Sequence, residues 1–376
     1  EVRVKDYLTR EQKEAIGLLQ IGTFLEYFDL MLYVHMAVLL NELFFPKTDP
    51  YTQSLIAAFA FCSTYVLRPF GALIFGRIGD TIGRKSTVII TTMMMAISCI
   101  VMASVPTYAQ IGIAATWVVT ICRIVQGLSS MGEVMGAAVY LTESLRPPAQ
   151  YMAVACVMCA SSVGGMCALG VANLCTHYNF NWRCAFWIGA GIAVVGSVAR
   201  TRLRETPEFI EMLRKKANKK KHLSEQDQYN YEGPSSINKK DLLAYFFCEC
   251  SYPFIFYISY IYFIPTLKTY GYTAHDVIFH NFLINIFSMC VYGFLVWLVK
   301  IFHPLSILKM RANFCLWLFL LLPFLIEQCT SAFQLLLLQM VLMAARGGAN
   351  PAHPLYIKRI YIGKRFTWTT MNYALS

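Results

Sequence analysis

Five charged residues interrupt otherwise apolar stretches in the first part of the chain: Glu26, Asp29, Arg68, Arg123 and Glu133. An ionisable side chain inside a membrane costs about 2.5–3.5 kcal/mol, so it usually faces a cavity or a charged partner. Burial raises the pKa of a carboxyl group, and a nearby guanidinium lowers it again. That balance is suited to binding and releasing protons or to holding a charged solute. Static ion pairs that fix helix packing are the alternative.

The positions of these residues along their segments place them at related depths. Glu26 and Asp29 lie three residues apart, on one face of a helix and near its midpoint. Arg123 is also near the middle of its segment, and Arg68 lies about 6 Å past the middle of another. Glu133 is about 10 Å nearer the cytoplasm than that level. We therefore expect the two arginines to set the pKa values of the three acids or to hold a substrate carboxylate.

The second part of the chain offers a further candidate, Arg346. It stands beside Gly347, Gly348 and Pro351, and such an interruption is typical of broken helices that line transport cavities. Glu249 is a second charge within an apolar segment there. The tyrosines at 252, 257 and 260 could offer ring faces to a quaternary ammonium group, although interfacial packing is the commoner role of such residues.

The segments that must position these residues are long and apolar. The chain has 376 residues, of which 57% are apolar and 14% charged, against about 45–50% and about 25% in soluble proteins. A helix needs about 20 apolar residues to span a membrane. About ten such spans are predicted: 14–40, 52–76, 86–105, 111–141, 151–175, 184–199, 241–264, 277–299, 312–326 and 332–350. Another helix begins near Phe366, and because residue 1 is not Met we expect a longer polypeptide.

The net charge of +11 is distributed in alternate loops. Basic residues cluster before residue 14 and at 77–85, 146, 300–311 and 358–365, while the intervening loops are nearly free of them. Positive loops face the cytoplasm, so the N-terminus is predicted to be cytoplasmic. The charge is an orientation signal rather than the sign of a nucleic-acid-binding protein.

The longest polar stretch, 200–240, follows the sixth predicted span. This layout is expected of two six-helix halves joined by a linker. We predict an N-terminal bundle at 1–203, a cytoplasmic linker at 204–240 and an incomplete C-terminal bundle at 241–376. The basic tract 214–221 within the linker is expected to be a solvated loop, with contact to anionic lipid headgroups as the alternative.

The sequence offers no sign of metal or covalent chemistry. Cys156 and Cys159 form a C-x-x-C pair, but they lie on an apolar segment without matching His or carboxylate partners and are expected to be packing residues. We find no nucleophile–base arrangement and no phosphate-binding loop. The sequence therefore predicts no enzyme activity, no cofactor and no metal.

One loop motif identifies a family. Residues 76–85 read G-R-I-G-D-T-I-G-R-K, which resembles the G-x-x-x-D-x-x-G-R-[RK] loop between helices two and three of the major facilitator superfamily. Gly76 and Gly83 would allow close helix approach and a tight turn. Asp80 can meet a helix N-terminus or a basic partner, and Arg84 and Lys85 would hold the loop in the cytoplasm.

Further segments resemble the metabolite:proton symporter family in particular, including its proline/betaine transporters. They are 22–29 (G-T-F-L-E-Y-F-D), 67–71 (L-R-P-F-G), 126–133 (Q-G-L-S-S-M-G-E) and 203–209 (L-R-E-T-P-E-F). Thr23 and Met131 depart from the family pattern, and 300–305 lacks the second D-x-x-G-R-R loop. The resemblance is strong from 14 to about 210 and thin beyond.

The resemblance implies an all-α integral membrane protein with the major facilitator fold, two pseudo-symmetric six-helix bundles around a cavity, in a bacterial inner membrane. It implies proton-coupled symport of a small solute by alternating access. A zwitterion such as proline or betaine is favoured over carboxylates such as 2-oxoglutarate or citrate. It also implies that Asp80 meets the start of helix eleven, near Thr367 to Thr370, and locks the outward-facing state. The alternative is a transport-deficient subunit that serves as a scaffold or partner in a larger complex.

Overall fold

The computed structural model describes residues 8–46, 65–177, 181–222, 239–272, 274–345 and 351–376. Every regular element in these residues is a helix, as the sequence predicts. Seven of the described helices are long and apolar enough to cross a membrane. The prediction of an all-α membrane protein is confirmed.

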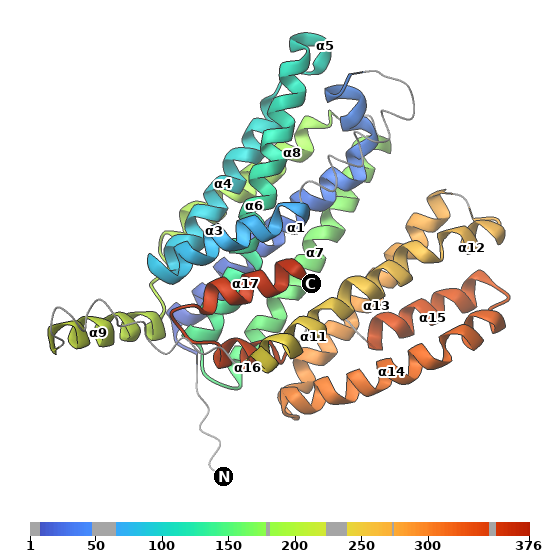
Figure 1. Ribbon diagram of the computed structural model, residues 1–376. Coiled ribbons are helices and arrows are strands. Elements are labelled where there is room, and N and C mark those ends of the chain that lie inside the picture. Colours follow the sequence, from blue (N-terminus) through green and yellow to red (C-terminus); the bar gives the residue numbers. More distant parts are fainter. Residues whose placement is uncertain (1–7, 47–64, 178–180, 223–238, 273, 346–350) are drawn as a thin grey trace.

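The first half of the chain forms one bundle of helices (Figure 1). They are α1 (Arg10–Phe44), α3 (Arg68–Thr81), α4 (Arg84–Ser104), the short α5 (Tyr108–Ile111), α6 (Ile113–Ser144), α7 (Ala149–His177) and α8 (Arg183–Arg200). Thr107 and Gln110 form a capping box at the start of α5, and Pro147 and Pro148 follow the end of α6, as expected where a helix cannot continue. The predicted spans match these helices within a few residues at the ends that are described.

The second half forms a second group of helices. They are α11 (Lys239–Tyr257), the π-helical turn η1 (Ile258–Tyr262), α12 (Ile264–Thr269), α13 (Ala274–Leu298), α14 (Pro304–Gln328), α15 (Ala332–Ala345), α16 (His353–Arg359) and α17 (Arg365–Leu375). The predicted span 312–326 was too short, because α14 begins at Pro304, with His303 accepting a hydrogen bond from the Leu305 amide. The predicted span 241–264 is interrupted by η1.

The polar linker contains a helix that the sequence analysis did not predict. Helix α9 (Pro207–His222) begins with a proline, which suits the first turn of a helix, and Lys215 pairs with Glu211 one turn away. The solvated loop expected at 214–221 was therefore wrong for this segment. Figure 1 shows α9 projecting sideways from the first bundle.

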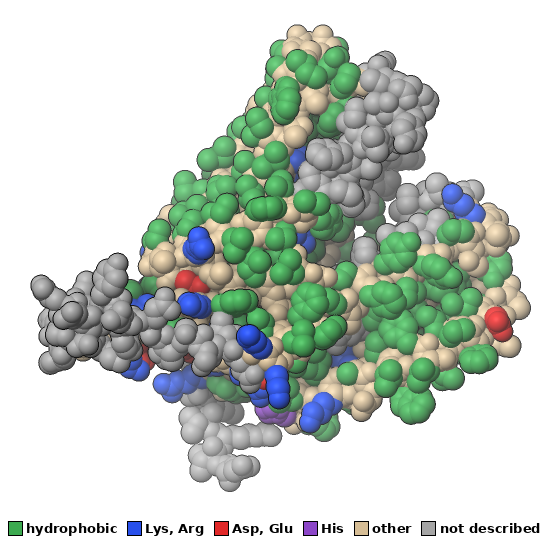
Figure 2. All heavy atoms as spheres, in the orientation of Figure 1, with side chains coloured by type: hydrophobic (Ala, Val, Ile, Leu, Met, Phe, Trp, Pro, Cys, Tyr) green, Lys and Arg blue, Asp and Glu red, His purple; other side chains and the backbone are tan. Residues whose placement is uncertain are grey.

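The two groups of helices meet at one end and diverge toward the other. We call the end that holds the loops 81–84, 200–207 and 360–364 the basic end. Figure 1 shows α16 and α17 close to the first bundle there, whereas α5 and α12 lie far apart at the opposite end. In Figure 2, most of the visible Lys and Arg side chains gather near α9 and α16, and the surface over α3, α4 and α6 is mainly apolar.

The buried clusters agree with this shape. Near the opposite end, one apolar cluster is built around Phe44 and Val105 from the first half alone, and another around Phe263 and Leu335 from the second half alone. At the basic end, Phe366 of the second half packs with Val88 and Leu19 of the first. The described halves thus share a core only toward the basic end.

Candidate functional site

The first pair of charges joins α1 to the start of α3. Glu26 is 3% exposed, and its Oε1 lies 3.8 Å from Nη2 of Arg68. The other carboxylate oxygen of Glu26 and Nε of Arg68 are buried without a hydrogen-bond partner. The Arg68 guanidinium lies over the Tyr65 ring at 4.7 Å. Buried polar atoms are almost always hydrogen-bonded, so this pair has unused capacity to bind a proton or a polar solute.

The second pair joins α1 to α6 and is more fully partnered. Asp29 Oδ2 lies 3.7 Å from Nη1 of Arg123, and Asp29 Oδ1 accepts a hydrogen bond from Cys99 Sγ at 3.4 Å. Arg123 also donates to Gln126 at 2.8 Å and lies 4.0 Å from the centre of the Tyr33 ring. Because Glu26 and Asp29 are one helical turn apart, the two pairs lie side by side.

Glu133 does not join these pairs. Its carboxylate binds Arg200 of α8 and accepts hydrogen bonds from Thr91 and Thr92 of α4. Arg200 is fully buried and also donates to the carbonyl groups of Leu18 and Leu19 at 3.0 Å each. The sequence analysis expected Arg123 or Arg68 to set the pKa of Glu133. The ion pair of Glu133 is instead with Arg200, which looked like the first residue of the linker but reaches into the bundle.

Gly22 makes room for this network. A Cβ atom built at residue 22 would overlap the Arg200 guanidinium and the Glu133 carboxylate. Moving Arg200 away would break its hydrogen bonds, since its nitrogens donate to Thr92, Glu133 and two backbone carbonyls of α1. Glu133 and Arg200 therefore form a structural ion pair whose two members are also hydrogen-bonded to neighbouring helices.

The motif loop contacts the start of α17. Asp80 Oδ1 accepts a hydrogen bond from the Phe366 amide at 3.0 Å, and Oδ2 accepts from the amide and hydroxyl of Thr367 at 2.9 and 2.7 Å. A carboxylate at a helix N-terminus satisfies its free amides and its positive dipole end. The structure thus places Asp80 at the helix start that the resemblance implied.

The two motif glycines permit this approach. A Cβ atom at Gly76 would lie 2.7 Å from the Thr367 Cα atom. Because that atom belongs to the backbone, no side-chain movement could relieve the overlap. Gly83 has a φ of 134°, a conformation that other residues rarely adopt. The amides of Arg84 and Lys85, which follow it, donate to the Glu205 carboxylate at 3.1 and 3.2 Å.

Arg84 is fully buried, and it makes contacts that the sequence analysis, which expected it only to hold the loop in the cytoplasm, did not predict. Its guanidinium binds Glu143 through Nε and Nη2, and it donates to the carbonyls of Gly79 at 2.7 Å and Ile362 at 2.6 Å. Glu143 also accepts from Arg365 at 3.0 Å, and Arg365 in turn binds Glu208 at 2.6 Å. The buried Glu143 carboxylate therefore binds one arginine from each half.

Sequence reasoning missed Glu143, Arg200, Glu205 and Arg365. Each stands at the end of an apolar segment or next to a basic loop, where a charge is expected to be solvated. The candidate Arg346 and its neighbours Gly347 and Gly348 lie outside the described residues. Glu249 is described, and its Oε1 lies 2.8 Å from His353 Nε2.

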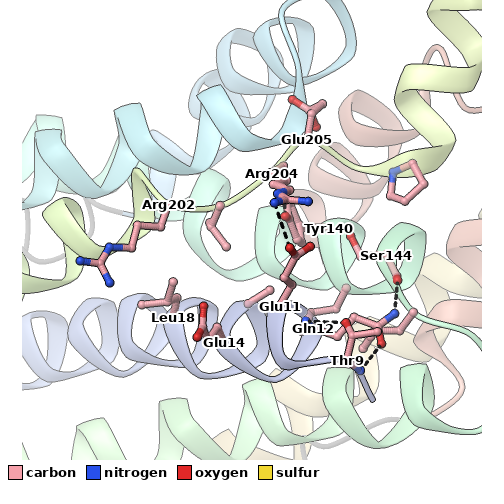
Figure 3. A pocket seen from close by; sticks show the side chains of 15 residues that line it. Thr9, Glu11, Gln12, Glu14, Leu18, Tyr140, Ser144, Arg202, Arg204 and Glu205 are labelled. Atoms are coloured by element: carbon pink, nitrogen blue, oxygen red, sulfur yellow. Dashed lines mark hydrogen bonds and ion pairs between the residues drawn. The ribbon is translucent and has the colours of Figure 1, made fainter. Parts of the chain in front are cut away.

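A pocket of 320 Å³ lies at the basic end, between α1, α6 and the segment that follows α8. Figure 3 shows Arg204 and Glu11 pointing toward one another across it, at 2.9 Å. Both side chains are largely exposed, and such pairs contribute little. None of its lining residues belongs to the buried pairs around Glu26 and Asp29, so we do not assign solute binding to it.

Cys156 and Cys159 line an apolar groove of 770 Å³ on the surface between α1, α7 and α8. In the described part of the chain, no group of three or more His, Cys, Asp or Glu side chains is arranged to hold a metal.

Similar proteins are membrane transporters. A proline/betaine transporter of Salmonella typhimurium is 32% identical over 204 residues, which is 52% of this chain and 41% of that protein. A glycine betaine/proline/ectoine/pipecolic acid transporter of Dickeya dadantii is 29% identical over 210 residues, 54% of this chain and 42% of that protein. The chain therefore matches less than half the length of these curated relatives.

Solved structures share the fold over nearly the whole chain. The proton:xylose symporter XylE bound to 6-bromo-6-deoxy-D-glucose has a TM-score of 0.75 at 15% identity, covering 98% of this chain and 87% of that one. The human organic anion transporter MFSD10 has a TM-score of 0.64 at 16% identity, covering 97% and 91%. The family model of the Major Facilitator Superfamily matches residues 19–368. The chain is a member of the Major Facilitator Superfamily of multi-pass membrane transporters.

Proposed function

We propose that the chain is a secondary active transporter that carries a small organic solute together with protons by alternating access, without covalent chemistry. The observation that supports this most is the Glu26–Arg68 pair, in which a carboxylate oxygen and a guanidinium nitrogen are buried without hydrogen-bond partners. Leaving such groups unsatisfied costs about 1–3 kcal/mol each. A proton or a solute that formed hydrogen bonds with these groups would remove that cost, and its binding would be favoured by a similar free energy.

The favoured solute is a zwitterion such as proline or betaine. Acid and base lie together in both pairs, Glu26 with Arg68 and Asp29 with Arg123, and such a lining matches a molecule that carries both charges. Arg68 or Arg123 would hold the carboxylate of the solute. Two similar proteins, a proline/betaine transporter and a glycine betaine/proline/ectoine/pipecolic acid transporter, support the same class of solute. A di- or tricarboxylate such as 2-oxoglutarate or citrate is the second candidate.

Glu133 has a different role in this proposal. Its carboxylate is fully partnered by Arg200, Thr91 and Thr92, so we assign it to bundle stability rather than to proton coupling. Arg346 stays a prediction from the sequence.

The basic end is proposed to face the cytoplasm of a bacterial cell, which places the N-terminus inside. The described halves meet at this end and diverge at the other, which supports an outward-facing state. Asp80, Arg84 and the rest of the motif loop would then lock the cytoplasmic side. The proposed units are a bundle at 1–203, a linker at 204–240 and a second bundle at 241–376.

Uptake into proteoliposomes tests the proposal. Radiolabelled proline, glycine betaine, 2-oxoglutarate and citrate would be offered separately, with and without an imposed inward proton gradient. We expect gradient-driven accumulation of proline or glycine betaine, abolished by a protonophore. Accumulation of the carboxylates alone would reject the zwitterion assignment, and uptake indifferent to the gradient would reject proton coupling.

A further inference from the structure

Helix α9 carries an exposed apolar stripe that the proposed function does not use. Ile210 is 39% exposed and Leu213 is 45% exposed, and Ala217 is exposed as well. At 3.6 residues per turn, these three residues lie within about 60° of one another around the helix. The rest of α9 is strongly polar, since its sixteen residues include six basic and two acidic ones. The helix is therefore too polar to cross a membrane, yet it exposes large apolar side chains on one face.

Basic side chains border this stripe on both sides. Lys216 lies about 60° around the helix from Leu213, and Arg214 lies about 40° from Ile210 on the other side. Both are exposed, as is Lys215. An apolar face bordered by Lys and Arg is typical of a helix that lies in the interface of a membrane. Long basic side chains reach the headgroups there, while the apolar residues between them enter the acyl boundary.

The opposite face of α9 fixes the helix to the rest of the protein. Phe209 and Met212 are buried, and the Arg84 guanidinium lies 4.6 Å from the centre of the Phe209 ring. In the same first turn, Glu208 binds Arg365 at 2.6 Å. The apolar stripe is therefore held in a defined orientation. A surface that binds it does not have to order the start of the helix first.

The start of α9 lies beside the edge of the lipid-facing surface of the first bundle. That surface reaches the basic end at Ile82, which is 62% exposed, and at Val198 in the last turn of α8, which is 66% exposed. A Cβ atom at Gly83, next to Ile82, would lie 3.4 Å from the Phe209 ring. Figure 1 shows α9 extending sideways from this end, away from the second group of helices. Lipid headgroups surround a membrane protein at this level.

We propose that α9 is an interfacial helix that binds anionic lipid headgroups, with Ile210 and Leu213 in the acyl boundary and the exposed basic residues 214–216 on the headgroup phosphates. Charge selects this occupant: the basic residues of α9 outnumber its acidic ones three to one, and each basic residue near an anionic membrane surface strengthens binding roughly fivefold. A second copy of α9 would instead bring like charges together. The inference does not depend on solute transport.

Hydrogen–deuterium exchange of the whole protein in lipid nanodiscs tests the proposal, because both membrane surfaces are accessible there. The discs contain phosphatidylcholine alone or a mixture with phosphatidylglycerol. We expect the amides of 210–218 to exchange at least about fivefold more slowly in the anionic discs than in the neutral ones. Added salt should reduce this difference, because it screens exposed charges. Equal exchange in the two kinds of disc would overturn the proposal.

A variant that combines Arg214→Gln, Lys215→Gln and Lys216→Gln should lose most of the difference between the discs. Since Lys215 also pairs with Glu211 within α9, the variant is judged by the ratio of its exchange rates in the two kinds of disc and not by either rate alone. The charge-matched control changes three exposed basic residues outside α9 to Gln: Lys13, Arg146 and Lys300. The control should keep the wild-type ratio. An unchanged ratio in the α9 variant, or an equal loss in the control, contradicts specific binding by α9.

Photocrosslinking identifies the occupant of the stripe. The photoreactive residue p-benzoylphenylalanine is placed at position 213 in the full chain, and the products formed in nanodiscs are analysed by mass spectrometry. We expect adducts with lipid acyl chains, in higher yield in the anionic discs. Crosslinks to a second copy of the chain, without lipid adducts, would show that the stripe is a protein interface and would overturn the proposal.

Discussion

Asp80 on α3 caps the first turn of α17, although Phe366, whose amide it accepts at 3.0 Å, lies 286 residues later in the chain. The same carboxylate holds Thr367 through both amide and hydroxyl. A helix cap usually comes from the residue just before the helix. Here it comes from the other half of the molecule, so the cap and the closure of the basic end are one interaction.

Asp80→Asn should loosen that closure. Asparagine keeps one acceptor oxygen but turns an amide nitrogen toward the remaining donors, and it loses the charge that suits a helix N-terminus. We expect a cost of about 1 kcal/mol, or roughly fivefold faster amide exchange at 365–370 by hydrogen–deuterium exchange. Asp241→Asn removes an acid that pairs at an exposed site with Arg359 and is the control. Equal exchange in both variants would refute the capping role of Asp80.

Gly22→Ala should destabilise the first bundle. The added Cβ overlaps Arg200 and Glu133, and disrupting a buried ion pair costs about 3–5 kcal/mol. We expect the apparent melting temperature in detergent to fall by roughly 5–10 °C. Gly17→Ala is a matched control on the same helix, because a Cβ there meets nothing within 4 Å. A melting temperature for Gly22→Ala equal to that of the control would show that the pair readily rearranges.

Arg365→Ala should release α9 from the bundles. Arg365 joins Glu208 at 2.6 Å to the buried Glu143 at 3.0 Å. Losing these charged hydrogen bonds should speed tryptic cleavage at Arg214 to Lys216 by about tenfold. Lys358→Ala removes a half-exposed partner of the same Glu208 at 3.7 Å and should change the rate little. Similar rates in the two variants would show that α9 is held by other contacts.

The sequence carries the fold and part of the site because the relevant signals are local. Glu26 and Asp29 are conspicuous because a charge within an apolar run needs a reason, and the 76–85 motif identifies the Asp80 loop. Arg200, Glu143 and Arg365 could not be recognised in this way. They stand where a membrane segment meets a polar loop, and there a charged residue is ordinarily solvated. Their burial depends on partners that are distant in the chain, such as Leu18 for Arg200 and Arg365 for Glu143.

The start of α14 and the presence of α9 were predicted wrongly for a related reason. Lys309 and Arg311 made the first turns of α14 look like a loop, yet Pro304 starts the helix and Arg311 is 5% exposed. In α9 the dense positive charge suggested an unstructured linker. The proline at its first position and the Glu211–Lys215 pair are compatible with a helix, but they are weak signals beside the composition.

The most direct test of the central claim compares Glu26→Gln with Glu133→Gln in proteoliposomes loaded with, and offered, proline or glycine betaine. Each variant loses one buried carboxylate. Of the two, Glu26 has an oxygen without a hydrogen-bond partner, whereas the Glu133 carboxylate is paired with Arg200. We predict that Glu26→Gln abolishes the accumulation of solute driven by a proton gradient but keeps solute exchange. Glu133→Gln should lower the melting temperature, while the protein that remains folded still accumulates solute. Gradient-driven accumulation by Glu26→Gln at the wild-type rate would contradict the account.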